Sequence, residues 1–536
     1  MAERALYLDY AATTPVDARV AERMRAFLSP DGEFGNPASM QHAYGRVAHD
    51  AVEKAREQVA SLIGAEAAEI VWTSGATESN NLAIKGVAEA YADRGRHMVT
   101  MKTEHKSVVD VCRYLEQQGW RITWLPPQPD GRISTETLAA AINEETVLVS
   151  LMLVNNETGV LQDIASIGRL TRERGVLLHV DAAQAVGKMP VDVEHMQTDL
   201  LSVSAHKLYG PKGIGALYVR RRPRARLMPQ IHGGGHERGM RSGTLPTHQI
   251  VGMGEACRIA DEAMAKEAER IRALRDRLWQ GLSELPEVYR NGSDSHNVAG
   301  ILNVSFAGVD GEALHAGLSG LAVPLALSSG SACTAASQES SYVLRALGRE
   351  DELAYASVRF SLGRWTTQDE VDRVITSVQT LVNALRRRSP AWQKDCAGPA
   401  PGMGDEHPQY SDAVWRYFTR ALAADPSEDE ADLVVASDTP GSRARMQLRA
   451  RIEGGKFVSA EARVYGCVSS LAAGAWLAEY LIGKSPEQLQ VTTAEIEQDL
   501  QLAPVKRHCA LMAEDLLGMI SRQARLTVDA AEKVAS

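Results

Sequence analysis

Cysteine is scarce in this chain of 536 residues, which holds only six of them, widely spaced. A secreted disulfide scaffold is therefore excluded, because such scaffolds are short and dense in cysteine. Long apolar runs are also missing: none approaches the ~18 residues that span a membrane, and the N-terminus is acidic where a signal peptide needs an apolar stretch. We expect a cytoplasmic protein with no membrane partner.

Positive charge is in deficit, with 58 Lys and Arg against 68 Asp and Glu, a formal net charge of -10. General attraction to nucleic-acid phosphates is therefore unfavourable, and we predict no direct nucleic-acid partner. Hydrophobic residues make up 44% and charged residues 24%, the balance of a soluble globular protein with a large core. The length excludes a single small module.

Short aliphatic runs alternate with longer amphipathic segments in the first part of the chain. Residues 69–73, 147–152 and 176–180 are near-continuous apolar strands, which indicate a mostly parallel sheet covered by helices on both faces. After Gly252 come a long helical pattern, a strand-like run at 300–306 and a further helix at 368–385. The order predicts an α/β domain followed by a smaller α+β domain.

A stretch dense in Gly and Pro and without periodicity divides the chain at residues 395–409. Such composition is typical of a linker, so we place a first unit at 1–394 and a second at 410–525, with a tail at 526–536. In the second unit, residues 445–452 alternate like a half-buried strand, and helical patterns start at Ser469 and His508.

Three predicted strand ends carry polar groups. Residues 73–80 (TSGATESN) follow a strand and open a helix, so their backbone N–H groups and the Thr77 hydroxyl either bind a phosphate or serve as an ordinary N-cap. Asp181 ends a second buried strand, where it needs a cationic partner. Lys207 follows a third, and alone it would be read as a surface lysine. Together, an anion cradle, a carboxylate and an amine match the needs of pyridoxal 5'-phosphate.

Further motifs carry a specific family resemblance; they lie at residues 8–15, 103–106, 154–157, 232–237 and 328–334. Through them, residues 1 to about 390 resemble cysteine desulfurases of the IscS/NifS type in the class V aminotransferase family. The resemblance implies a fold-type I pyridoxal-phosphate enzyme, a homodimer, that acts on L-cysteine. It also implies a large, mostly parallel-sheet domain with a smaller α+β domain.

The resemblance assigns roles to individual residues. Lys207 would be the Schiff-base lysine and His105 would stack on the ring and move protons. Asn156 and Arg359 would hold the substrate carboxylate, a task suited to a guanidinium. The remaining cofactor-binding residues would be Ala76, Thr77, Asn156, Asp181, Gln184, Ser204, Ala205, His206 and Thr244, the last reaching the phosphate of the other subunit.

Cys333 decides the implied reaction. It lies in a Ser-, Gly- and Ala-rich segment that we expect to form a mobile loop, whereas Cys112 and Cys257 fit buried structural positions better. Its thiolate would attack the sulfur of the substrate, leaving alanine and a persulfide on Cys333. Just before this segment, residues 323–327 make the chain a few residues longer than the family pattern. The extra length would change how far the loop reaches and which acceptor it serves.

The second unit resembles, more distantly, the IscU/NifU-type scaffold on which iron–sulfur clusters are built, an α+β domain. The resemblance rests on segments around Cys467 and on Pro504 to Cys509. Where the family has a Cys-Gly-Asp turn, this chain has Pro440-Gly441-Ser442, so one cysteine and the aspartate are missing. The family's Leu-Pro-Pro-Val-Lys chaperone motif stands here as residues 502–506, with Ala503 in place of the first proline.

Three interpretations of the second unit remain open. In the first, it accepts sulfur on Cys467 or Cys509. In the second, it binds zinc or an iron–sulfur cluster through Cys467, His508 and Cys509, with an outside ligand such as Cys333 or Cys396. In the third, it is a docking module that takes the place of a separate scaffold protein. We predict a desulfurase that supplies sulfur to iron–sulfur scaffold or other acceptor proteins. The alternatives are a regulatory assembly module, and a selenocysteine lyase or aminotransferase of the same fold.

Overall fold

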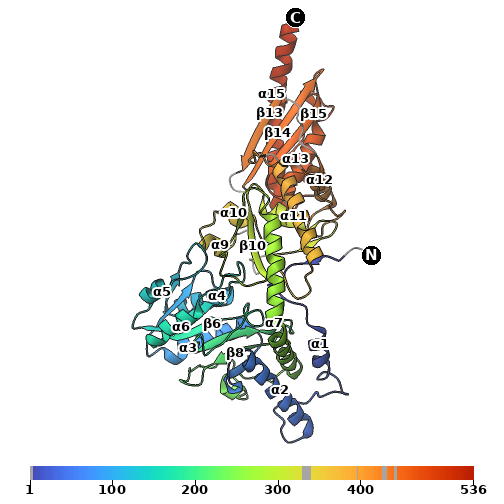
Figure 1. Ribbon diagram of the computed structural model, residues 1–536. Helices are drawn as coiled ribbons and strands as arrows, with labels where there is room; N and C mark the ends of the chain where they lie inside the picture. Colours follow the sequence, from blue (N-terminus) through green and yellow to red (C-terminus); the bar gives the residue numbers. More distant parts are fainter. Residues whose placement is uncertain are drawn as a thin grey trace.

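The computed structural model of the protein describes residues 4–328, 340–394, 396, 398–424, 431–439 and 443–535. The molecule is elongated, with a large domain at one end, a small domain in the middle and a C-terminal domain from which the last helix projects (Figure 1). Cys333 and residues 440–442, both singled out in the sequence, lie outside the described residues.

A seven-stranded sheet, in the order β2-β8-β7-β6-β5-β3-β4, forms the centre of the large domain. Its pairs are parallel except those of β8, which runs antiparallel to both neighbours, so the predicted mostly parallel sheet is confirmed. The strands are β2 (Ile70–Thr73), β3 (His97–Met101), β4 (Arg121–Leu125), β5 (Thr146–Met152), β6 (Leu177–Asp181), β7 (Leu200–Ser204) and β8 (Gly215–Val219).

Helices cover both faces of this sheet. Leu148 and Val149 are successive, fully buried residues of β5 that belong to different apolar clusters, one on each face. Burial on both sides is why the strand sequences show continuous apolar runs rather than alternation. The helices of this domain are α1 (Ala18–Arg25), α2 (Ala43–Leu62), α3 (Ala76–Tyr91), α4 (Lys106–Gln117), α5 (Thr135–Ala141), α6 (Ile164–Glu173) and the first part of α7 (Thr247–Leu282).

The small domain confirms the predicted strand and helix, now β10 and α11. Its sheet has the order β12-β10-β9, and the residues that lengthen the chain before the Cys333 segment form β11, which pairs in parallel with β1. The elements are β1 (Leu6–Tyr7), β9 (Val288–Arg290), β10 (Ile301–Phe306), α8 (Gly311–Ser319), β11 (Leu325–Ala326), α9 (Tyr342–Ala346), α10 (Asp351–Tyr355), β12 (Ser357–Ser361) and α11 (Gln368–Arg388).

The C-terminal domain has its own antiparallel sheet, β13-β14-β15, packed against helices. The predicted strand and both helices are present, and the last helix continues through residues 526–535, which we predicted as a tail. The elements are α12 (Asp412–Ala423), β13 (Leu433–Thr439), β14 (Ala444–Glu453), β15 (Lys456–Tyr465), α13 (Val468–Leu481), α14 (Thr493–Leu500) and α15 (Arg507–Ala535).

One continuous apolar core joins the small domain to the C-terminal domain. Trp415 of α12 is 1% exposed, stacks on His407 and donates its indole N–H to Gly404 O (2.8 Å). Lys506 forms an ion pair with Glu312 of α8 (2.6 Å), and both side chains are mostly buried. The two domains are therefore firmly docked. Within the described ranges, every helix is too short or too polar to cross a membrane.

Candidate active site and metal centre

A cavity of about 560 Å³ opens at the carboxyl ends of β6 and β7. Strand ends in parallel sheets are where α/β proteins bind ligands. The cavity brings together most of the residues that the sequence singled out. Its lining includes Ala76, Thr77, His105, Asn156, Asp181, Gln184, Ser204, His206, Lys207 and Arg359.

One end of the cavity is built for an anion. Helix α3 begins at Ala76, so its first N–H groups point toward this end, and its N-cap Gly75 has a φ of +145°, which favours glycine. Ser204 and His206 line the same cavity, and Ser204 Oγ would lie 3.7 Å from a Cβ added at Gly75. Burial, and then the charge of Lys207, lowers the pKa of His206 to about 4, so this imidazole is a neutral hydrogen-bonding group at pH 7.

The middle of the cavity holds Asp181, which is 5% exposed. Its carboxylate accepts hydrogen bonds from the Asn80 amide (2.8 Å) and the Ala183 backbone (3.0 Å). The Asn80 amide also reaches Ser107 Oγ (2.8 Å), which lies 2.8 Å from His105 Nδ1. The backbone N–H of Ser107 donates to the same Nδ1, so the neutral ring carries its proton on Nε2.

Sequence reasoning missed Asn80 and Ser107. A signal was available for the first, because Asn80 lies one helical turn beyond Ala76 and Thr77 and so shares their face of α3. Ser107 follows His105 by two residues at a helix start and gave no signal of its own. Together they connect the carboxylate to the imidazole across two helices.

Lys207 ends a 3₁₀ turn (Ala205–Lys207) directly after β7. Its ammonium donates to the carbonyl oxygens of Ala11 and Ala12, and Gln184 also donates to Ala11 O (2.8 Å). The N-terminal motif at residues 8–15 therefore closes one side of the cavity. Two predicted cofactor residues are not among the lining residues: Ala205, the first residue of the turn, is buried, and Thr244 is exposed.

The far end of the cavity has unsatisfied polar atoms. Arg359 donates to Asn156 O (2.8 Å) and to Asp9 Oδ1 (2.7 Å), yet its Nε is buried and has no hydrogen-bond partner in the described residues. Asn156 Oδ1 is orphaned in the same way. Buried polar groups are normally paired, so these atoms indicate a place for a polar ligand. The anion cradle, the buried carboxylate and the lysine fit pyridoxal phosphate, and this end fits an amino-acid carboxylate.

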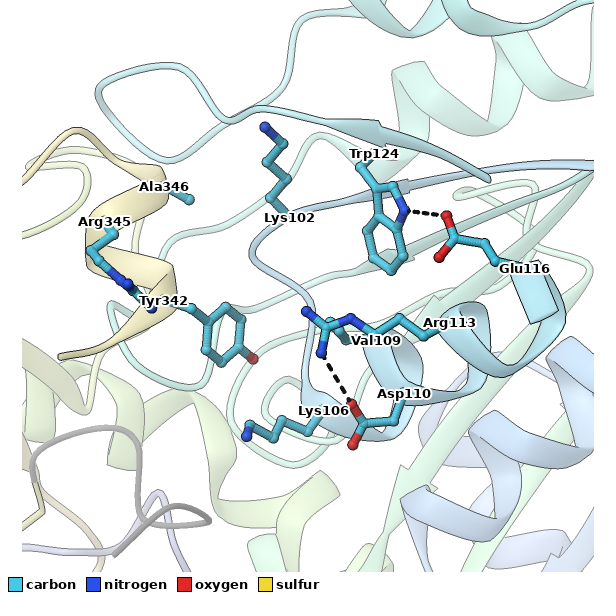
Figure 2. Close-up of a pocket in the computed structure, with 10 residues that line it drawn as sticks. All are labelled: Lys102, Lys106, Val109, Asp110, Arg113, Glu116, Trp124, Tyr342, Arg345 and Ala346. Atoms are coloured by element: carbon cyan, nitrogen blue, oxygen red, sulfur yellow. Dashed lines mark hydrogen bonds and ion pairs between the residues drawn. The ribbon is translucent and has the colours of Figure 1, made fainter. Parts of the chain in front are cut away.

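A second cavity, of about 650 Å³, is lined by residues of α4, β4 and α9 and by Lys102 (Figure 2). Lys102, Lys106 and Arg113 extend into it from one side, and Arg345 of α9 lies across from them. Tyr342, also on α9, donates to Glu104 O (2.6 Å). This bond ties α9, which follows the Cys333 segment in the chain, to the loop that carries His105.

The C-terminal domain brings Cys467, His508 and Cys509 together as predicted. Their ligand atoms all lie within 4.8 Å of one another, with the two sulfurs 3.8 Å apart. Cys467 is the N-cap of α13, and the other two residues lie in the first turn of α15. Cys396 is not in this group; its carbonyl accepts a bond from Arg387.

The two buried thiols are in hydrogen-bond contact, with their sulfurs 3.8 Å apart. A hydrogen bond from the Cys509 thiol, and another from His508, hold the pKa of Cys467 well below its usual range. The pKa of Cys509 is raised because its proton is donated to Cys467. Elsewhere, burial raises the pKa of Cys112 and Cys257 to about 12, which suits the inert structural role predicted for them.

Comparisons with known proteins agree with this geometry. Residues 6–374 match the model of the family "Aminotransferase class-V", and residues 409–521 match "NifU-like N terminal domain". The chain is 62% identical over 388 residues to "Cysteine desulfurase IscS" of Aeromonas hydrophila subsp. hydrophila and 60% identical over 388 residues to that of Escherichia coli; each match covers 72% of this chain and 95% of the relative.

Solved structures give the same result for the fold. A "NIFS-LIKE PROTEIN" superposes with a TM-score of 0.65 at 36% identity, covering 70% of this chain and 98% of that one. A structure titled "SspA in complex with cysteine" superposes with a TM-score of 0.60 at 38% identity, covering 67% of this chain and 99% of that one.

Proposed function

The chain belongs to the class-V aminotransferase family, as a cysteine desulfurase with a fused NifU-like domain, and we propose how its own residues carry out the reaction and where the sulfur goes. Pyridoxal phosphate is the cofactor expected of this family. When bound, it supplies an electron-withdrawing ring that weakens bonds around the α-carbon of the substrate. We take residues 1–394 as the desulfurase domain and 410–525 as the NifU-like domain.

Four groups of residues would hold the cofactor. The first turn of α3, with Ala76 and Thr77, together with Ser204 and His206, would bind its phosphate, and Gln184 its ring hydroxyl. Asp181 would keep the ring nitrogen protonated, and the hydrogen bonds from Asn80 and Ala183 fix that carboxylate in place. Lys207 would form the covalent link. Ala205 and Thr244 remain proposed contacts, Thr244 toward the partner subunit's phosphate.

Arg359 and Asn156 would hold the carboxylate of L-cysteine with the polar atoms that lack partners. Because Arg359 is anchored by Asp9 and by the Asn156 carbonyl, its guanidinium is fixed before substrate arrives. His105 and Lys207 line the same cavity and would move protons to and from the substrate. A neutral His105 ring carries its proton on Nε2, since Nδ1 accepts from Ser107.

Cys333 would take the sulfur. Its thiolate attacks the substrate sulfur; an S–S bond forms as the C–S bond breaks, and the released electron pair is protonated to give alanine. Ser328, the last described residue before Cys333, lies beside the site, because its carbonyl oxygen accepts from the Arg359 backbone N–H (2.8 Å). Ser340, the first described residue after Cys333, donates to Asp351 (2.9 Å). Five residues from Ser328, Cys333 has a reach of roughly 17 Å.

We further propose that Cys467 or Cys509 receives this sulfur. The thiolate of Cys467 would attack the outer sulfur of the Cys333 persulfide, which leaves the Cys333 thiolate behind, so no external oxidant or reductant is needed. The supporting observation is that Arg443 of the C-terminal domain pairs with Asp351 (3.8 Å), the partner of Ser340. Between transfers, Cys467, His508 and Cys509 would bind zinc modestly, or an iron–sulfur cluster transiently.

The assembly and location follow from the same reasoning. We propose a homodimer, because Thr244 is exposed and can reach a neighbouring subunit. We propose the cytoplasm, because free cysteines such as Cys112, Cys257 and Cys467 persist in a reducing compartment. Iron–sulfur scaffold and other acceptor proteins would be the partners that consume the sulfur.

The activity is tested by measuring alanine and persulfide together from L-cysteine. Cys333→Ala should keep the cofactor and lose persulfide formation, whereas Cys396→Ala should behave like the wild type. Persulfide turnover in Cys333→Ala would move the chemistry to another cysteine. Alanine without any sulfur product would favour the lyase or aminotransferase alternative. If an added, separate scaffold protein receives sulfur at an undiminished rate, the fused domain does not occupy the scaffold's docking surface on the desulfurase domain.

A further inference from the structure

Two thiols of the C-terminal domain touch across two helices. Cys467 Sγ lies 3.8 Å from Cys509 Sγ, and Ser470 Oγ lies 3.4 Å and 3.3 Å from these two sulfurs. Cys467 is the N-cap of α13, whereas Cys509 lies in the first turn of α15. Thiols this close can be joined by a disulfide with a small movement of the two side chains.

The two thiols differ in how well a reagent can reach them. Cys467 is 9% exposed, whereas Cys509 is 0% exposed. Incoming sulfur therefore reaches Cys467 first, which agrees with the role proposed for its thiolate. The Cys509 sulfur then lies against the inner sulfur of a Cys467 persulfide, the sulfur that belongs to the cysteine itself.

His508 is placed to take the proton of the fully buried thiol. Its Nε2 lies 3.3 Å from Cys509 Sγ, and the residue is only half-buried, so its ring is accessible to water. The thiolate, not the thiol, is the nucleophile when one sulfur displaces another. The imidazole therefore supplies the base that an attack by Cys509 needs.

We propose that Cys509 resolves the Cys467 persulfide and releases its outer sulfur as hydrosulfide. The Cys509 thiolate attacks the inner sulfur, so that a Cys467–Cys509 disulfide forms while the bond between inner and outer sulfur breaks. The outer sulfur leaves with that electron pair and is reduced, and the Cys509 sulfur is oxidised. The proton taken by His508 goes to the hydrosulfide. A dithiol reductant then restores both thiols. The proposal rests on the proposed transfer of sulfur to Cys467.

The contact favours this step over a transfer of the outer sulfur to Cys509. Attack on the outer sulfur would move the persulfide to a fully buried residue, where its charge would lose hydration. Attack on the inner sulfur uses the contact that is already present. A thiol held in contact also reacts at a far higher effective concentration than a thiol in solution. The C-terminal domain therefore turns persulfide sulfur into free sulfide once per chain before a reductant is needed.

A single turnover tests the proposal in the full-length holoenzyme. The protein is freed of metal with a chelator and receives one equivalent of isotope-labelled L-cysteine per active site, without added reductant. Thiols are alkylated at timed intervals. Tryptic peptides 464–484 and 508–522 carry Cys467 and Cys509 separately, so a disulfide joins them into one product. We expect label on Cys467 at the earliest times, followed by labelled sulfide and joined peptides in equal amounts.

Removal of the second thiol isolates the resolving step. Cys509→Ala should keep the labelled persulfide on Cys467 and release sulfide at least about tenfold more slowly, because no thiol then touches the inner sulfur. Cys396→Ala is the matched control and should behave like the wild type. In the wild type itself, persulfide that persists on Cys467 without joined peptides would overturn the proposal, and so would label that moves to Cys509.

A persulfide supplied from outside distinguishes this step from delivery by Cys333. Glutathione persulfide is added to Cys333→Ala, which lacks the sulfur donor. Joined peptides and sulfide in this variant, but not in the wild type with L-cysteine, would mean that delivery from Cys333 fails while the resolving role of Cys509 stands. Persulfide on Cys467 without joined peptides, or an unmodified Cys467, would refute the resolving role.

Discussion

A single methyl group at Gly320 should loosen the docking of the two domains. Gly320 caps α8 with a φ of -101°, which alanine tolerates, but an added Cβ would lie 2.3 Å from Cζ2 and Cη2 of Trp415. Trp415 is fully buried and anchored by Gly404, so it has little room to move. Overpacking of this kind costs about 1–3 kcal/mol, which corresponds to a roughly 5- to 150-fold lower equilibrium constant for docking.

The assay compares protease cleavage in residues 395–409 with alanine formation from L-cysteine. Gly320→Ala should be cleaved faster and should show a separate unfolding transition for the C-terminal domain, while alanine formation stays unchanged because no cavity residue moves. Gly402→Ala is a matched control, since nothing lies within 4 Å of its Cβ. Adding Trp415→Phe to Gly320→Ala should restore docking. Wild-type cleavage and a single transition in Gly320→Ala would refute the proposed close packing.

Three further predictions concern the large domain. Lys207→Ala should lose the visible absorption of the lysine-bound cofactor, and an unchanged spectrum would contradict the role of Lys207. Arg359→Lys should raise KM for L-cysteine about 10- to 100-fold, because a lysine cannot reproduce the two parallel hydrogen bonds of a guanidinium. An unaltered KM in steady-state kinetics would exclude Arg359 as the residue that binds the substrate carboxylate. Burial lowers the pKa of His179 to about 4, between Ser150 and Ser202. As pH falls, His179 therefore takes up a proton at a higher pH in the unfolded chain than in the folded chain, which favours unfolding. This should lower the free energy of unfolding by up to about 3 kcal/mol between pH values of about 6.5 and 4. Urea unfolding across this range should show that slope, reduced in His179→Asn.

The parallel strands of the large domain could be predicted because burial on both faces leaves apolar runs such as residues 147–152. The antiparallel placement of β8 between β7 and β2 could not, since β7 directly precedes β8 in the chain but β2 lies far earlier, and tertiary packing brings β2 to this edge. The pairing of β1 with β11 joins residues more than three hundred positions apart, and two-residue strands carry no periodicity. Helix α12 and strand β13 were also missed.

The cavity residues could be predicted because parallel topology brings strand ends such as Asp181 and Lys207 to one edge. The link through Asn80 and Ser107 could not, because hydrogen bonds between two helices depend on their packing. The packing of α8 on α13 could not be predicted for a similar reason. The two helices belong to different domains, and only the docking of these domains brings them into contact.

The fate of the sulfur tests the account most directly. After brief turnover with isotope-labelled L-cysteine, tryptic peptides are analysed by mass spectrometry for persulfide on Cys333, Cys467 and Cys509. We predict label on Cys467 or Cys509 in the wild type and on neither in Cys333→Ala. Persulfide confined to the Cys333 peptide, in a protein that is isolated without metal, would contradict transfer to the C-terminal domain and leave it only a docking role.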